Sequence, residues 1–243
     1  MDNPIPNVRS DIPVVQNLVV LALFWVMADL AYYFALPALG YGADYNDYPV
    51  EISIFYLFWV GLAGIYFWPL YARWPEFARW PTLSDRRIAT ALWTIMFAAA
   101  IIYIRTVIPN MSPSTWPEGN IADAPDIIVA TADYFLPKSI EILFQQLLVL
   151  ALVLTLSAAG RPLLQVVITC SALFGVMHLL MILGGTPLRG VLVFSISATV
   201  FGALMPMLIL RVRYGLALSV VMHWSFYAVI VQIARTAPHP GLN

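Results

Sequence analysis

Charged side chains are scarce in this sequence. Only 10% of the 243 residues are Asp, Glu, Lys or Arg, and 61% are hydrophobic. A soluble domain usually carries about a quarter charged residues, so most of this chain is not predicted to lie in water. The 12 basic residues are matched by 13 acidic ones, which leaves no basic surface for nucleic acid.

Cysteine is almost absent as well. Cys170, within an apolar run, stands alone, which excludes an intramolecular disulfide and a cysteine-based metal site. We expect it to be a small core residue. The segment before the first apolar run lacks a basic start and a small-residue cleavage site, so that run is predicted to be a permanent anchor rather than a signal peptide.

Long apolar runs are what the sequence does contain. About 20 apolar residues are needed for a helix to cross the hydrocarbon core of a bilayer. Seven runs reach that length: 14–36, 52–72, 88–108, 135–157, 162–183, 189–210 and 214–236. With no internal repeat and no linker, the chain is predicted to be one all-α membrane domain over 1–243, a polytopic bundle of about seven transmembrane helices.

The loops between these runs differ in basic residues, which indicates an orientation. One side would hold eight: Arg9, Arg73, Arg79, Arg86, Arg87, Arg161, Arg211 and Arg213. The other would hold four: Arg105, Lys138, Arg189 and Arg235. The N-terminus is therefore predicted to be cytoplasmic and, with seven spans, the C-terminus to lie outside.

Few ionisable residues remain inside the predicted spans once the loops are set aside. They are Asp29, Glu141, His178 and His223, and each costs several kcal/mol in lipid unless it is paired or hydrated. Asp29 has no partner at helical spacing and is interpreted as structural or pore-facing. The third histidine, His239, belongs to the C-terminal tail.

Glu141, His178 and His223 fall at a similar depth in the predicted fourth, fifth and seventh spans. We therefore expect them to face one cavity. Each has a companion one turn away on the same helix face: Gln145, Phe174 and Tyr227 respectively. A carboxylate and two imidazoles can hold and deprotonate a water molecule. The same residue types also fit a structural hydrogen-bond cluster, a proton relay or a transport pathway.

Three short motifs add a resemblance to these residues. LFGVMH contains Phe174 and His178 in a Phe-x-x-x-His pattern, SIEILFQQ contains Glu141, and HWSFY contains His223. In this order they resemble the CAAX-prenyl protease and bacteriocin-processing (CPBP, or Abi) family of glutamic-type intramembrane proteases. The resemblance covers about residues 134–232, which would be the catalytic core of a divergent member.

The motifs depart from the family pattern at three points. The family carries Glu-Glu-x-x-x-Arg, but here Glu141 is flanked by Ile140 and Ile142, and Gln145 or Gln146 replaces the arginine. The family's His-x-x-x-Asn ends here in Tyr227. These departures bear on whether the chain still catalyses.

The resemblance implies a role for each site residue. Glu141 would be the general base that takes a proton from water, and His178 would orient the water or share its proton. His223 would stabilise the developing oxyanion, with Tyr227 donating in place of the asparagine. Gln145 and Phe174 would support them. No metal or cofactor is required, although the two histidines and Glu141 could also bind zinc with an open fourth position.

The resemblance also implies a substrate and a location. The substrate would be a membrane-anchored or exported peptide, cleaved at a site in the outer half of a bacterial cytoplasmic membrane. Two other functions remain open: a non-catalytic membrane scaffold or immunity protein of the same fold, and a proton-coupled transporter.

Overall fold

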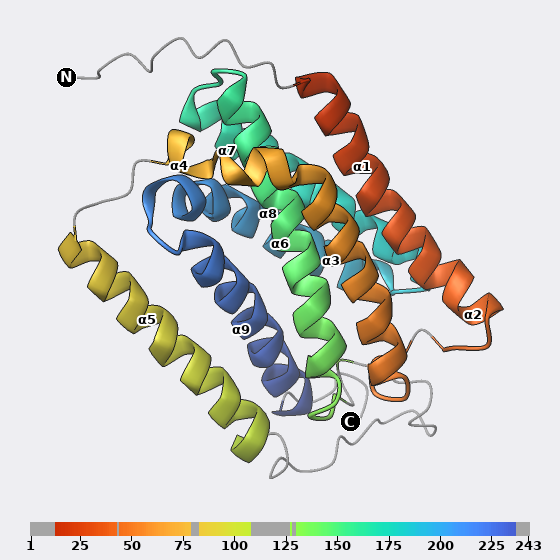
Figure 1. Cartoon of the computed structure of the whole chain (residues 1–243). Coiled ribbons are helices and arrows are strands. Elements are labelled where there is room, and N and C mark those ends of the chain that lie inside the picture. Colours follow the sequence, from red (N-terminus) through yellow and green to blue (C-terminus); the bar gives the residue numbers. More distant parts are fainter. Residues whose placement is uncertain (1–12, 43, 79–82, 108–126, 128–129, 237–243) are drawn as a thin grey trace.

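Every regular element in the computed structural model is a helix within the residues it describes, 13–42, 44–78, 83–107, 127 and 130–236. In chain order these are α1 (Val14–Leu30), the π-helical η1 (Ala31–Ala35), α2 (Leu36–Ala38), α3 (Pro49–Ala72), α4 (Trp74–Phe77), α5 (Leu83–Ile102), the π-helical η2 (Tyr103–Val107), α6 (Phe135–Ala158), α7 (Leu163–Met177), the 3-10 helix η5 (His178–Gly184), α8 (Leu188–Arg211) and α9 (Gly215–Thr236). Figure 1 shows the long helices crossing one bundle.

Six helices in the described ranges are long and apolar enough to cross a membrane. They are Val14–Ala38, Pro49–Ala72, Phe135–Ala158, Leu163–Gly184, Leu188–Arg211 and Gly215–Ile233. The remaining predicted span is also helical, over α5 and η2. The all-α class is therefore confirmed, the predicted number of about seven is close to the six found, and the chain has the helices of an integral membrane protein.

The predicted boundaries are wrong at some ends. The first span was predicted to end before Pro37, but the helix continues to Ala38 after a π-helical turn over Ala31–Ala35. A proline lacks an N–H and its ring crowds the carbonyl four residues earlier, and a widened turn before it relieves that contact. The third predicted span begins at Leu83 instead of 88.

Helix α6 is the centre of the bundle (Figure 1). It packs against α1, α3, α7, α8 and α9, and 72% of its most apolar stretch is buried, against 22–44% for the other five spanning helices. Because its neighbours cover it, α6 can carry polar side chains that an outer helix would expose to lipid.

Helices α7 and α8 lie closest together, and two glycines allow it. A Cβ added to Gly175 would lie 2.0 Å from Oγ1 of Thr199, and one added to Gly202 would lie 2.8 Å from the carbonyl oxygen of Cys170. Cys170 is fully buried at this contact, so its prediction as a small core residue is confirmed. The close approach fixes the position of the C-terminal end of α7, where His178 lies.

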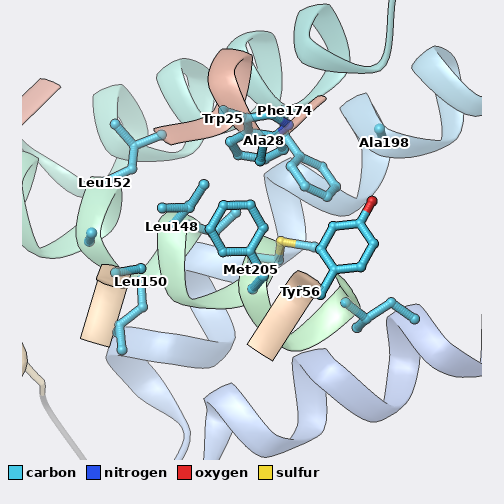
Figure 2. Packing of buried hydrophobic residues seen from close by; sticks show 14 of the residues in the cluster. Trp25, Ala28, Tyr56, Leu148, Leu150, Leu152, Phe174, Ala198 and Met205 are labelled. Carbon is cyan, nitrogen blue, oxygen red and sulfur yellow. The ribbon is translucent and has the colours of Figure 1, made fainter. Parts of the chain in front are cut away.

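An apolar cluster around Phe174 joins α1, α6, α7 and α8. The rings of Trp25 and Phe174 lie 5.6 Å apart, and Leu148 and Met205 belong to the same buried cluster. Figure 2 shows Trp25, Ala28 and Phe174 next to one another in this packing. The cluster closes one side of the region that contains the predicted site residues.

Candidate functional site

Glu141 lies two turns into α6, and both of its carboxylate oxygens accept hydrogen bonds. Oε2 accepts from Nζ of Lys138 at 2.5 Å and from the hydroxyl of Tyr45 at 2.7 Å. Oε1 accepts from Nε2 of Gln145 at 2.9 Å. The predicted pairing of Glu141 with Gln145, one turn apart, is thus confirmed.

Lys138 was assigned to a loop by its place at the start of an apolar run, and that assignment is wrong. The structure places it inside α6 with only 7% of its surface exposed. Its ammonium lies 4.5 Å from the ring centre of Tyr45 and 4.4 Å from that of Tyr227, with Tyr134 at 5.8 Å. A carboxylate and aromatic ring faces together stabilise the cation away from water.

Tyr45 was not identified from the sequence. It belongs to the connection between α2 and α3, is 5% exposed, and lies 3.2 Å from Tyr56 between the two hydroxyl oxygens. Burial raises the pKa of its phenol well above the usual value, and the nearby charge of Glu141 raises it further. Tyr45 is therefore a neutral hydrogen-bond donor at physiological pH. No spacing rule points from it to a residue 96 positions later.

Asp29 on α1 forms no hydrogen bond or ion pair within the residues that the structure describes, so its interpretation as structural or pore-facing stays a prediction. The four residues Lys138, Glu141, Gln145 and Tyr45 are called the charged cluster below.

His178 lies at the junction of α7 and η5, where the helix tightens from α to 3-10. Its Nδ1 is 2.7 Å from the carbonyl oxygen of Phe174, and the two rings lie 4.8 Å apart. A carbonyl only accepts, so Nδ1 carries a hydrogen, and Nε2 of the neutral ring is an acceptor. The predicted support of His178 by Phe174 thus includes a backbone contact as well as the ring.

His223 on α9 is held mainly by a residue of α6. Its Nδ1 lies 3.3 Å from Nε2 of Gln146, and its ring lies 5.5 Å from that of Tyr227 and 5.7 Å from that of Phe174. From the sequence, Gln146 was identified only as one of two residues that could replace the arginine of the Glu-Glu-x-x-x-Arg motif. Its contact with a histidine on another helix had no sequence signal.

One small cavity connects these residues. His178, His223 and Tyr227 line it together with Phe174 and other aromatic and small side chains of α8 and α9. Its volume is about 10 Å³, which is close to the space that one water molecule needs. The prediction that all three residues face one cavity is wrong for Glu141, which does not line it because its carboxylate is turned to Lys138 and Tyr45. Lys138 contacts both the carboxylate of Glu141 and the ring of Tyr227.

The structure thus brings the predicted residues together in two adjacent groups. Glu141 and Gln145 belong to the charged cluster, while His178, His223, Tyr227 and Phe174 surround the cavity. In the part of the chain that the structure describes, no three His, Cys, Asp or Glu side chains are placed to hold a metal ion, so the zinc alternative gains no ligand set there. His239 lies outside the described residues.

Comparison of the chain with protein-family models, with curated proteins and with solved structures found no match. The resemblance to the CPBP family thus remains a prediction from the three motifs.

Proposed function

We propose that this chain is an intramembrane peptide hydrolase in which Nε2 of His178 takes the proton of a water molecule. Glu141, which does not line the cavity, assists with its negative charge. The observation that carries the proposal is the cavity, about 10 Å³ in volume, which two histidines and Tyr227 line within a bundle of apolar helices. A water molecule there would lie beside His178, whose Nε2 is an acceptor. It would also lie beside Tyr227, whose ring contacts Lys138 of the charged cluster.

The reaction would run as a direct hydrolysis. The water oxygen forms a bond to the carbon of the peptide carbonyl and gives its proton to Nε2 of His178. The negative charge of Glu141 stabilises the imidazolium that forms, because opposite charges attract more strongly in an apolar region than in water. His223 and the hydroxyl of Tyr227 donate to the oxyanion. The C–N bond then breaks, and the proton passes from His178 to the leaving amine.

The proposed substrate is a membrane-anchored or exported peptide. Basic residues are more frequent in the loops between the second and third, fourth and fifth, and sixth and seventh helices, which favours a cytoplasmic N-terminus. Glu141 then lies in the outer half of a bacterial cytoplasmic membrane, two turns from the outer end of α6. A site at that depth favours exported substrates.

A second candidate, a non-catalytic membrane scaffold, is favoured by one observation. Three donors already bind the two oxygens of Glu141, which is the arrangement expected of a structural ion pair. Under this reading Glu141 holds α6 to the connection between α2 and α3, and no reaction depends on it.

The experiment that decides between them is release of a C-terminal fragment from a co-expressed, membrane-anchored exported reporter. We expect Glu141→Gln to lower the release rate by at least about 100-fold, because the imidazolium that forms on His178 loses the negative charge that stabilises it. Glu76→Gln is the matched control, because Glu76 also forms an ion pair with a cation three residues away but does so on the exposed helix α4.

Accumulation of each variant in the membrane is measured in parallel, because Glu141→Gln leaves Lys138 without its counter-ion. Equal release by wild type and by a fully accumulated Glu141→Gln variant would contradict the hydrolase and support the scaffold.

A further inference from the structure

Two adjacent glutamines of α6 serve different groups. Gln145 donates to Glu141 in the charged cluster, whereas Gln146 is fully buried and turns toward α8 and α9. Gln146 contacts Met205, Ser219 and His223. Two adjacent residues of α6 therefore face different parts of the site: Gln145 faces the carboxylate of Glu141, and Gln146 faces the imidazole of His223.

The contact with Met205 assigns the orientation of the Gln146 amide. The hydroxyl of Ser219 has one hydrogen and lies 2.7 Å from Oε1 of Gln146 and 2.8 Å from the carbonyl oxygen of Leu216, so it fits either orientation. The amide nitrogen faces the sulfur of Met205 at 3.6 Å and Nδ1 of His223 at 3.3 Å. The reversed amide would set its oxygen against a thioether sulfur, which is a weak acceptor and offers no hydrogen.

This orientation determines the tautomer of His223. An amide N–H that donates to Nδ1 requires a bare lone pair there, so the hydrogen of the neutral ring is on Nε2. His178 has the opposite arrangement, because the carbonyl of Phe174 requires the hydrogen on Nδ1. Two neutral imidazoles that line the same cavity are thus held as opposite tautomers.

We propose that Gln146 is a positioning residue that holds His223 with its hydrogen on Nε2, so that the cavity has an acceptor in His178 and a donor in His223. This inference rests on the proposed hydrolysis, in which His178 takes the proton of water and His223 donates to the oxyanion. The other tautomer of His223 would turn a lone pair toward that oxyanion and repel it.

The test is nitrogen NMR of the full-length protein, labelled with ¹⁵N-histidine and reconstituted in lipid nanodiscs. The chain has three histidines, so single substitutions of His178 and His239 assign the spectrum. We expect one buried neutral ring with its hydrogen on Nδ1, from His178, and one with its hydrogen on Nε2, from His223. A wild-type His223 with its hydrogen on Nδ1 would overturn the proposal without any variant.

Two substitutions test whether Gln146 sets the tautomer. In Gln146→Glu, studied at a pH where the new carboxylate is ionised, the side chain only accepts, so the hydrogen of His223 moves to Nδ1 or the ring becomes doubly protonated. In Gln146→Leu the donor is lost, and the pure Nε2–H signal becomes a mixture of both tautomers. Gln145→Leu is the matched control, because Gln145 contacts Glu141 and leaves the His223 signal unchanged.

Should Gln146→Glu fail to accumulate, the two leucine variants still decide. An unchanged His223 signal in Gln146→Leu would overturn the role of Gln146. The readout is independent of cleavage, so the two proposals fail separately: expected tautomers without peptide release would refute only the hydrolase, and release with His223 protonated on Nδ1 would refute only the positioning role.

Discussion

Two ion pairs in the described residues have the same spacing along the chain but lie in different surroundings. Arg73 and Glu76 pair at 2.9 Å near α4, where their side chains are 28% and 49% exposed. Lys138 and Glu141 pair at 2.5 Å inside α6, where exposure is 9% and 12%. The spacing alone does not distinguish the two, since each joins residues three apart.

The surroundings make the difference. An exposed pair is solvated whether or not it forms, so it contributes about 0–1 kcal/mol. The pair inside α6 has exchanged water for a phenol, an amide and aromatic rings, so neither partner can be removed without leaving a charge in an apolar region. A carboxylate within a spanning helix is therefore stabilised by all of its hydrogen-bond donors together.

The largest effect is expected for Lys138→Met. The substitution leaves the carboxylate of Glu141 buried and unpaired, which costs about 3–5 kcal/mol of unfolding free energy. Thermal and denaturant unfolding of the purified protein in detergent would measure it. Arg73→Met is the control and should cost no more than about 1 kcal/mol. Equal losses for both would remove the distinction between the pairs.

A smaller effect is expected for Tyr45→Phe. The variant keeps the ring against Lys138 but removes the hydroxyl that donates to Glu141, at a cost of about 1.5–3 kcal/mol for a hydrogen bond to a charged group. Tyr41→Phe, at an exposed tyrosine of the same connection, should leave stability unchanged. A Tyr45→Phe protein as stable as wild type would show that Lys138 and Gln145 suffice for Glu141.

Removing both charges should restore most of the stability. In Lys138→Met/Glu141→Met no unpaired charge remains. We expect the unfolding free energy of this double variant to lie within about 1–2 kcal/mol of the wild-type value. The same unfolding measurements, arranged as a double-mutant cycle, give the coupling between the two residues. A double variant as unstable as Lys138→Met alone would mean that the lysine acts through its tyrosine rings.

The smallest effect is expected for Glu76→Gln, which breaks the exposed pair. The loss should not exceed about 1 kcal/mol and should shrink further at high salt, because exposed charges are screened. Unfolding at low and high ionic strength would check both points. A loss of several kcal/mol of unfolding free energy that does not change with salt would mean that Glu76 is buried by a contact from outside α4.

Contacts within one helix were within reach of the sequence, and contacts between helices were not. Glu141 with Gln145, His178 with Phe174, and His223 with Tyr227 are each four residues apart, so the helical repeat brings them together. No such rule links Tyr45 to Glu141. The same holds for Gln146, which meets His223 from another helix.

Lys138 shows why hydropathy alone misplaced a charge. It lies near the start of its apolar run, where a long side chain usually extends to the interface. Here other helices surround α6, and the nearest stable position for the ammonium is between Glu141 and the rings of Tyr45 and Tyr227. Burial of the helix, which the sequence pattern does not report, decided the outcome.

By itself, the sequence determined that this protein is a bundle of membrane-spanning helices, because long apolar runs have no other stable place than lipid or one another. It also identified Asp29, Glu141, His178 and His223 as ionisable residues of those helices. The tertiary structure alone decided that α6 lies at the centre, that its carboxylate is paired with Lys138, and that Glu141 lies outside the cavity of the two histidines. These depend on which helix faces meet, and uniformly apolar helices leave that choice to side-chain packing and to a few hydrogen bonds.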